Sequence, residues 1–145
     1  MSCKPDPAAT YATMTPAAFG KSLRGLGVNL LCRDVRRMAD YMAAVFGLEV
    51  FRLSADFAIL RHDETVFQLH ADATYRAHPL LGVLPETPPR GAGVQLYLFG
   101  IDPDAAVERA PPEMVLEPPA DKPHGLREAT ILTPEGYAFS PARAL

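Results

Sequence analysis

Residues 23–47 read LRGLGVNLLCRDVRRMADYMAAVFG, and this stretch decides the fold. The apolar run at residues 23–33 predicts a short strand, and Asp34 immediately after it is a favourable helix N-cap residue. The next apolar residues recur at helical spacing, namely Val35, Met38, Ala39, Met42, Val45 and Phe46. Gly47 suits the left-handed position that ends a helix. The stretch therefore predicts a strand followed by an amphipathic helix that buries one face on a sheet.

Three more strands are expected directly after this helix. Residues 48–53, 57–61 and 65–71 are rich in apolar and β-branched side chains, and a tight turn at residues 62–64 joins the last two. The first half of the chain therefore has the element order β-α-β-β-β.

The second half repeats this order without repeating the sequence. Residues 94–99 predict a strand, and Asp102 followed by Pro103 predicts the capped start of a short helix that ends at Ala110. The remaining strands are expected at residues 114–117, 128–132 and 137–140, with the last hairpin turn at residues 133–136. The pattern predicts an α+β fold of two βαβββ modules.

These modules occupy residues 23–74 and 93–145 of a single domain spanning 23–145. Residues 1–22 show little periodicity and are interpreted as an extended or disordered N-terminal arm. Residues 75–92 are rich in proline and glycine and are expected to form a connector without a stable element of its own. Most of the 15 prolines stand at such joints, so the strands are expected to be nearly free of proline.

Composition excludes several classes of function. The 145 residues carry a net charge of −3, with no block of like charge that would bind nucleic acid. No apolar run reaches the roughly 20 residues that cross a membrane, and no export signal is recognisable, so the chain is expected to be cytoplasmic. Cys3 and Cys32 do not form a disulfide framework, and Cys32 is expected to be a small core residue.

Four stretches together resemble the vicinal oxygen chelate superfamily, which includes glyoxalase I, extradiol dioxygenases and the bleomycin and fosfomycin resistance proteins. Residues 27–47 resemble its first strand and helix, and QLYLFGIDPDAA from Gln95 looks like the start of its second module. KPHGLREA from Lys122 is similar to the segment before its final hairpin. TPEGY from Thr133 resembles its Asp-Pro-Asp-Gly turn.

The resemblance implies two curled mixed sheets around a shared cavity, usually in a homodimer. Metal-dependent members carry ligands on the first and last strands of each module, and the matching positions here are Gly27, Gln68, Gln95 and Ser140. A catalytic divalent site needs three or more donors such as imidazole and carboxylate. We therefore expect no metal, and no other cofactor, in the cavity.

The alternation of strand residues identifies a cavity-facing side independently of the resemblance. Gln68 shares its strand face with His70, and Gln95 shares its face with Tyr97 and Phe99. Apolar walls with a few hydrogen-bonding groups are typical of small-molecule sites. The candidate ligand-binding residues are Asn29, Gln68, His70, Gln95, Tyr97, Phe99 and Ser140.

Two hypotheses of different class follow, with a third left open. The first is a metal-free protein that sequesters or senses a small organic molecule. The second is an enzyme of the same superfamily, a lyase, isomerase or dioxygenase that uses an unrecognised metal, or else His70 as a base. The third is an interaction module that acts through its sheet edges.

His124 and Arg127 lie beside the final hairpin, where the family's loop covers the cavity mouth, so both are candidates for contact with a lid over the cavity. His62 stands in a turn and is expected to be solvated.

Overall fold

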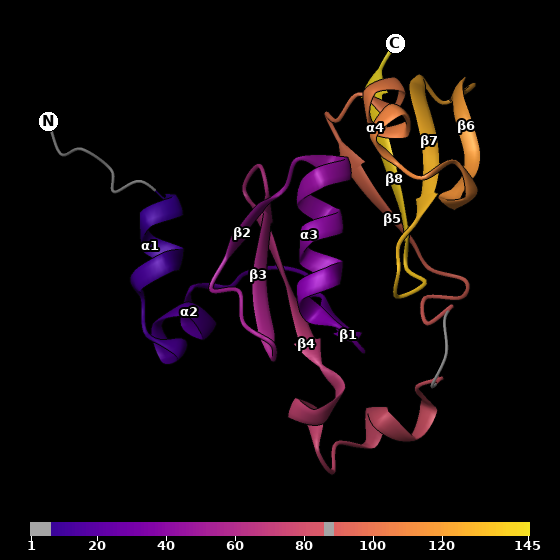
Figure 1. Ribbon diagram of the computed structural model, residues 1–145. Helices are drawn as coiled ribbons and strands as arrows, with labels where there is room; N and C mark the ends of the chain where they lie inside the picture. The colour runs from indigo at the N-terminus through magenta and orange to yellow at the C-terminus, as the bar shows by residue number, and fades with distance from the viewer. Residues whose placement is uncertain (1–6, 86–88) are drawn as a thin grey trace, which may run out of the picture.

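The chain folds into two four-stranded mixed sheets, with α3 (Val35–Phe46) on one face of the first and α4 (Pro103–Arg109) on one face of the second (Figure 1). The computed structural model describes residues 7–85 and 89–145. The first sheet has the order β1-β4-β3-β2, built from β1 (Asn29–Cys32), β2 (Glu49–Phe51), β3 (Phe57–His62) and β4 (Thr65–Ala71). The second has the order β5-β8-β7-β6, built from β5 (Gln95–Phe99), β6 (Val115–Asp121), β7 (Leu126–Leu132) and β8 (Ala138–Ala144).

The helix of the first module begins and ends where the sequence indicates. In α3 (Val35–Phe46), the Asp34 side chain accepts a hydrogen bond from the Arg37 amide at 3.0 Å, and Gly47 adopts φ 70° at the C-terminus. Its six apolar stripe residues are all buried. Both caps and the stripe were predicted, and all three are confirmed.

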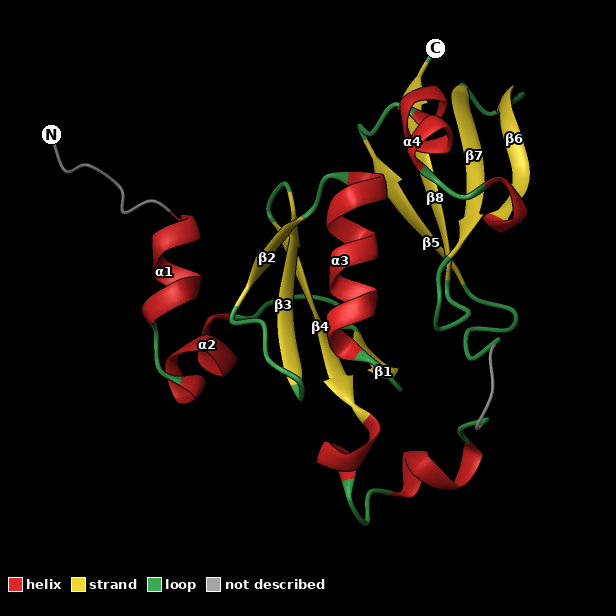
Figure 2. Cartoon of the chain, in the orientation of Figure 1, coloured by secondary structure: helices red, strands yellow, loops and turns green. Residues whose placement is uncertain are grey.

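The two modules share one hydrophobic core. Both α3 and the shorter α4 (Pro103–Arg109) lie on the same side of the sheets (Figure 2). The Phe139 ring of β8 lies 5.8 Å from the ring of Phe46 on α3 and 6.0 Å from that of Phe67 on β4. The predicted α+β fold of two modules is confirmed, and the sheets are open rather than closed barrels.

Buried polar groups also join the two modules. The Glu135 carboxylate, in the turn between β7 and β8, accepts hydrogen bonds from the amides of Arg33 at 2.9 Å and Asp34 at 2.8 Å. The Tyr137 hydroxyl donates to the Leu31 carbonyl at 2.8 Å. The second module therefore supplies hydrogen-bond partners for backbone groups between β1 and α3. The negative charge of Glu135 also lies beside the N-terminus of α3, where it is favourable.

Arg90 and Gly136 complete this contact, which we call the module junction. The Arg90 guanidinium binds the Asp72 carboxylate through two hydrogen bonds of 2.6 and 2.8 Å and also donates to the Leu31 carbonyl. Gly136 has φ 89°, and a Cβ atom there would lie 2.4 Å from the Cα of Pro89. The backbones approach so closely that only glycine fits.

The expectation of an extended or disordered arm is wrong for residues 7–22. These residues form two short helices, α1 (Pro7–Thr13) and α2 (Pro16–Ser22), and residues 1–6 lie outside the described part of the chain. The Thr15 hydroxyl caps α2 by accepting from the Ala18 amide, and Phe19 is buried. Tertiary packing of Phe19 stabilises a helix that the weak local pattern did not indicate.

The first strand is also shorter than the predicted residues 23–33. Residues 23–28 are irregular, and Gly25 takes φ 72°, so pairing with β4 begins only near Asn29. This segment crosses behind the first sheet, on the side opposite α3 (Figure 1). It therefore covers the sheet face that the alternation of residues assigns to the cavity.

The connector at residues 75–92 contains more structure than expected. Two 3₁₀ turns, Asp72–Tyr75 and Pro79–Val83, follow β4, and the His78 ring caps the second by accepting from the Leu80 amide. Residues 86–88 lie outside the described part. Pro79 at the first helical position and the His78 cap are sufficient to stabilise the second of these short turns.

Proline also enters the strands more often than predicted. Pro118 and Pro119 lie in β6, which is an edge strand whose pairing with β7 shifts register at this point. An edge position and an irregular ladder tolerate a residue that cannot donate a hydrogen bond. Pro141 lies inside β8 and pairs with Leu98. A third 3₁₀ turn, Pro112–Met114, precedes β6.

Candidate functional site

A cavity of about 960 Å³ lies between β4 and β5, and we call it the inter-sheet cavity. Residues 22–28 cover one side of it. Its wall is mainly apolar and includes Val66, Phe67, Gln68, Leu96, Tyr97, Leu98, Phe99 and Phe139. The size and lining are in the range of small-molecule sites.

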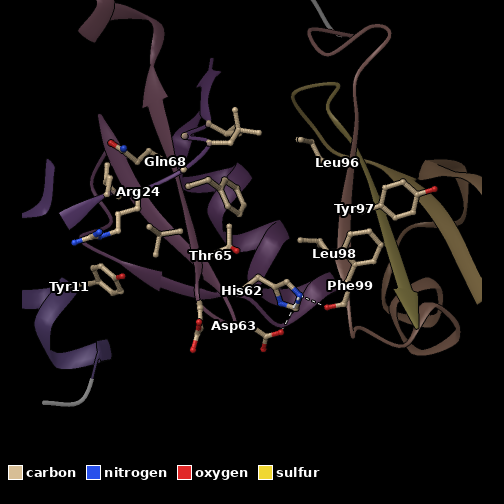
Figure 3. A pocket seen from close by; sticks show the side chains of 18 of the residues that line it. Tyr11, Arg24, His62, Asp63, Thr65, Gln68, Leu96, Tyr97, Leu98 and Phe99 are labelled. Atoms are coloured by element: carbon tan, nitrogen blue, oxygen red, sulfur yellow. Dashed lines mark hydrogen bonds and ion pairs between the residues drawn. The ribbon is translucent and has the colours of Figure 1, made fainter. Parts of the chain in front are cut away.

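Strand β5 divides its side chains between this cavity and the open face of the second sheet. Figure 3 shows Leu96 and Leu98 directed toward the first sheet and Tyr97 directed to the opposite side. At one end of the cavity, Nε2 of His62 lies 2.6 Å from the Phe99 carbonyl oxygen, which can only accept, so Nε2 donates. The expectation that His62 is solvated is wrong, because its side chain is only 19% exposed.

A second chamber, of about 530 Å³, lies between the N-terminal helices and the first sheet, and we call it the arm chamber. Gln68 and His70 of β4 line it, and Nε2 of His70 lies 3.2 Å from Oε1 of Gln68. The Phe57 ring lies 5.1 Å from the His70 ring. Burial lowers the pKa of His70, which favours the neutral imidazole.

The open face of the second sheet carries a chain of paired side chains, which we call the second-sheet network. Gln95 donates from Nε2 to the Ser140 hydroxyl at 2.8 Å, and the hydroxyls of Ser140 and Thr130 lie 2.9 Å apart. These three residues come from three adjacent strands, β5, β8 and β7. Their polar groups are therefore largely satisfied by one another.

Glu128 is the acidic centre of the same face. Its side chain is 7% exposed, and it accepts from the Tyr97 hydroxyl at 3.2 Å and lies 3.1 Å from Nε2 of His124. Lost hydration and the bond to Glu128 raise the pKa of Tyr97. The Tyr97 ring stacks on Phe99 at 5.0 Å. The buried carboxylate thus orients both a phenol and a half-exposed imidazole.

The structure separates the seven predicted site residues into three groups. Gln68 lines the inter-sheet cavity, and His70 joins Gln68 in the arm chamber. Tyr97 and Phe99 border the inter-sheet cavity from β5, but their stacked rings lie on the open face of the second sheet (Figure 3). The other three, Asn29, Gln95 and Ser140, line neither space. Asn29 donates to the Tyr75 hydroxyl at 3.0 Å, whereas Gln95 and Ser140 belong to the second-sheet network. Neither of these two spaces, both formed by described residues, has Gln68 and Gln95 on opposite walls.

Several residues of the site were missed by sequence reasoning. Glu128 shares a strand face with Thr130, so alternation along β7 could have found it. Phe19 and Met14 of the arm had no such signal, because their helices depend on tertiary packing. His124 contacts Glu128, and Arg127 binds Asp104 of α4 at 2.7 Å, so contact of either residue with a lid over the cavity stays a prediction.

The residues at the family's metal positions do not fit a catalytic divalent cation. Gly27 has no side-chain donor, and Gln95 and Ser140 bind each other. The fourth residue, Gln68, offers only an amide. Among residues 7–85 and 89–145, no group of three or more His, Cys, Asp or Glu side chains is placed to hold a metal ion. The expectation of a metal-free cavity stays a prediction.

Comparisons with known proteins agree with this architecture. Neither a protein-family model nor a curated protein matches the chain. A solved structure of a glyoxalase/bleomycin resistance protein/dioxygenase family enzyme from Burkholderia phytofirmans PsJN is 20% identical, covers 82% of this chain and 97% of its own, and superposes with a TM-score of 0.65. A glyoxalase/bleomycin resistance protein/dioxygenase from Nocardioides is 19% identical, with 89% and 91% coverage and a TM-score of 0.62.

A glyoxalase-related enzyme from Fulvimarina pelagi is 15% identical, with 83% and 87% coverage and a TM-score of 0.65. None of the helices in the described part of this chain is long and apolar enough to cross a membrane. With two βαβββ modules and these structural neighbours, the chain has the fold of the glyoxalase/bleomycin resistance/dioxygenase proteins, as its resemblance to the vicinal oxygen chelate superfamily implies.

Proposed function

We propose that this protein binds a small organic molecule without a metal and serves to sequester or sense it. The observation that carries this proposal is the inter-sheet cavity of about 960 Å³, in which the two matched metal positions that line it, Gly27 and Gln68, offer only a glycine and an amide. Such positions can orient a ligand by hydrogen bonds but cannot hold a catalytic cation.

The cavity wall supports an apolar or aromatic ligand of moderate polarity. Leu96 and Leu98 give apolar contact on one side, and the Gln68 amide supplies a polar group on the other. Charged residues also line the cavity, namely Arg24, Asp63 and Glu64. Binding free energy would come mainly from burial of apolar surface, with the amide setting orientation.

A metal-free acid–base enzyme is the second candidate function. It is favoured by His124 and Glu128, because a buried carboxylate that holds an imidazole orients it for proton transfer. His70, the base considered from the sequence, has only the Gln68 amide as a hydrogen-bond partner in the described residues. The pair on the second sheet is therefore the stronger acid–base arrangement.

Metal analysis tests the first part of the proposal. The purified protein is incubated with zinc, nickel, iron or manganese, passed through gel filtration and assayed for bound metal. The proposal expects less than stoichiometric retention of every metal. A stoichiometric metal that stays bound would overturn it.

A thermal-shift screen of antibiotics, glycopeptides and aromatic acids tests the cavity, because a ligand that binds the native state raises the midpoint of unfolding. A ligand in the inter-sheet cavity loses its shift in Gln68→Ala and keeps it in Gln95→Ala, which is the matched control. Loss only in Gln95→Ala would move the ligand to the second-sheet network and overturn the cavity. Retention in both variants would also refute the site.

The homodimer belongs to the same proposal. Phe99 is 57% exposed on the edge strand β5, which leaves apolar surface beside the cavity for a second copy to cover. Sedimentation velocity tests this directly. A monomer at all concentrations would contradict it.

A further inference from the structure

The arm chamber has two walls of different origin. Met14, Phe19 and Leu23 come from the N-terminal segment, and Phe57, Gln68 and His70 come from the open face of the first sheet. Its volume of about 530 Å³ is within the range of small-molecule sites. A ligand there would lie between the arm and the sheet.

The arm is fixed in place as a wall of this chamber. Arg52 donates from Nε to the Tyr11 carbonyl at 3.0 Å and from Nη2 to the Met14 carbonyl. The Tyr11 ring lies 6.0 Å from Phe19 and 5.8 Å from Phe51. Arg52 holds these contacts at φ 53°, a conformation that is unfavourable for a residue with a side chain. The contacts compensate for that strain.

Gln68 and His70 give the chamber one donor and one acceptor. Oε1 of Gln68 can only accept, so Nε2 of His70 carries the proton of their 3.2 Å contact. In a neutral imidazole the other nitrogen, Nδ1, is then an acceptor. The Gln68 amide nitrogen is a donor for which the described residues supply no hydrogen-bond partner. The two residues share one strand face and both line the chamber, so one ligand can contact both side chains.

The rest of the chamber selects a flat and neutral ligand. Phe57 and Phe19 are aromatic walls, and Met14 is an unbranched side chain that adapts to a ring surface. The two hydrogen bonds that the Arg52 guanidinium makes to described residues both go to arm carbonyls, so the arginine of the chamber is committed to the arm. An anion therefore has less to gain here than a neutral ring.

We propose that the arm chamber binds a neutral planar molecule with an adjacent hydrogen-bond donor and acceptor, such as a cyclic amide, and that the N-terminal helices form half of this site. The inference goes beyond the proposed function, because it adds a second site beside the inter-sheet cavity and names the ligand class of that site. A cyclic amide would donate its N–H to Nδ1 of His70 and accept at its carbonyl oxygen from the Gln68 amide.

Three bicyclic probes of similar size test the ligand class by calorimetry and by the imidazole NMR signals of His70. Oxindole carries the amide edge, indane lacks polar groups, and indane carboxylate carries a negative charge. Two hydrogen bonds worth about 1 kcal/mol each predict that the Kd of oxindole is at least about tenfold lower than that of indane. Equal affinities, or tightest binding of the carboxylate, would overturn the proposal.

Variants of the full chain test the location. Gln68→Met keeps the volume but removes the donor, so oxindole loses about fivefold in affinity while indane is unchanged. Phe19→Trp fills the chamber and weakens both probes. Leu116→Trp, at a side chain that is 58% exposed on β6, adds the same indole elsewhere and serves as the control. Unchanged oxindole binding in Phe19→Trp would refute the site.

The two proposals fail in different ways. If oxindole binding is insensitive to Phe19→Trp and screened ligands still require Gln68, the inter-sheet cavity stands and the arm chamber does not. If a stoichiometric metal is retained, the proposed function itself is lost. Gln68 lines both spaces, so the Phe19 variant is the one that separates them.

Discussion

The module junction and the second-sheet network both consist of hydrogen-bonded polar side chains, but they pair in opposite ways. At the junction, Glu135, Tyr137 and Arg90 reach backbone groups of the first module across more than 50 residues of sequence. In the network, Gln95 pairs with Ser140, and Tyr97 pairs with Glu128, side chain to side chain on adjacent strands.

This difference indicates what each set of contacts does. Backbone groups at the junction cannot move away, so an unpaired partner there would stay buried at a cost of about 1–3 kcal/mol. Side chains on the open face can rotate or exchange their partners for water or a ligand. The junction should therefore govern stability, and the network should contribute little to it.

Gly136→Ala should cause the largest loss of stability, because it forces apart two backbone segments that are in contact at the module junction. The added Cβ would lie 2.4 Å from the Cα of Pro89 at a φ of 89°. We expect a loss of about 3 kcal/mol or more in the free energy of unfolding, measured by urea denaturation. Gly82→Ala is the control, because a Cβ there meets nothing within 4 Å. Equal effects in the two variants would contradict the close approach.

Glu135→Gln tests the polar part of the junction. The amide keeps one acceptor for the Arg33 and Asp34 amides, loses the other and removes the charge at the start of α3. The expected loss is about 2 kcal/mol, again from urea denaturation. Glu108→Gln on the exposed side of α4 should change stability by less than about 0.5 kcal/mol. A neutral Glu135→Gln would show that the modules do not depend on this contact.

Tyr97→Phe applies the same test to the second-sheet network. It removes the 3.2 Å hydrogen bond to Glu128, which keeps its contact with His124. Since water can replace the lost donor on an open face, we expect a loss of about 1 kcal/mol or less. Thermal and urea unfolding measure it, with Tyr75→Phe, which removes the exposed hydrogen bond from Asn29, as the comparison. A loss as large as that of Glu135→Gln would break the distinction between the two regions.

The sequence predicted the elements whose signals are local. Asp34 and Gly47 marked the ends of α3, and strand alternation placed Leu69 toward the helix and Gln68 on the opposite face. Such signals act within a few residues of the chain. The element order of both modules could therefore be predicted.

The arm and the division of the site could not be predicted in this way. Phe19 lies in a helix that is stabilised by packing on a sheet, and the strands of that sheet come later in the sequence. Residues 23–28 do not pair with β4 because Gly25, at a positive φ, turns the backbone away. The separation of Gln68 from Gln95 depends on how the two sheets meet. That geometry is set by contacts such as Phe67 with Phe139, which have no local sequence pattern.

The pH dependence of stability should give the smallest effect, and it concerns the face under the arm. Burial lowers the pKa of His70 below its ordinary value of 6.5, so the unfolded chain binds the proton more readily. The stabilisation is complete above pH 6.5, is lost as pH falls through that value, and levels off below the folded pKa.

We expect His70→Gln to flatten the stability profile between about pH 8 and about pH 5 by less than about 1 kcal/mol, because the ring is only half-buried. Urea denaturation at each pH measures the profile, and His78→Gln controls for a histidine in the adjacent exposed turn. Superimposable profiles of wild type and His70→Gln would contradict the buried neutral imidazole. Without a neutral imidazole, Nδ1 of His70 could not accept the N–H of a cyclic amide. This small effect on stability therefore also tests the ligand proposed for the arm chamber.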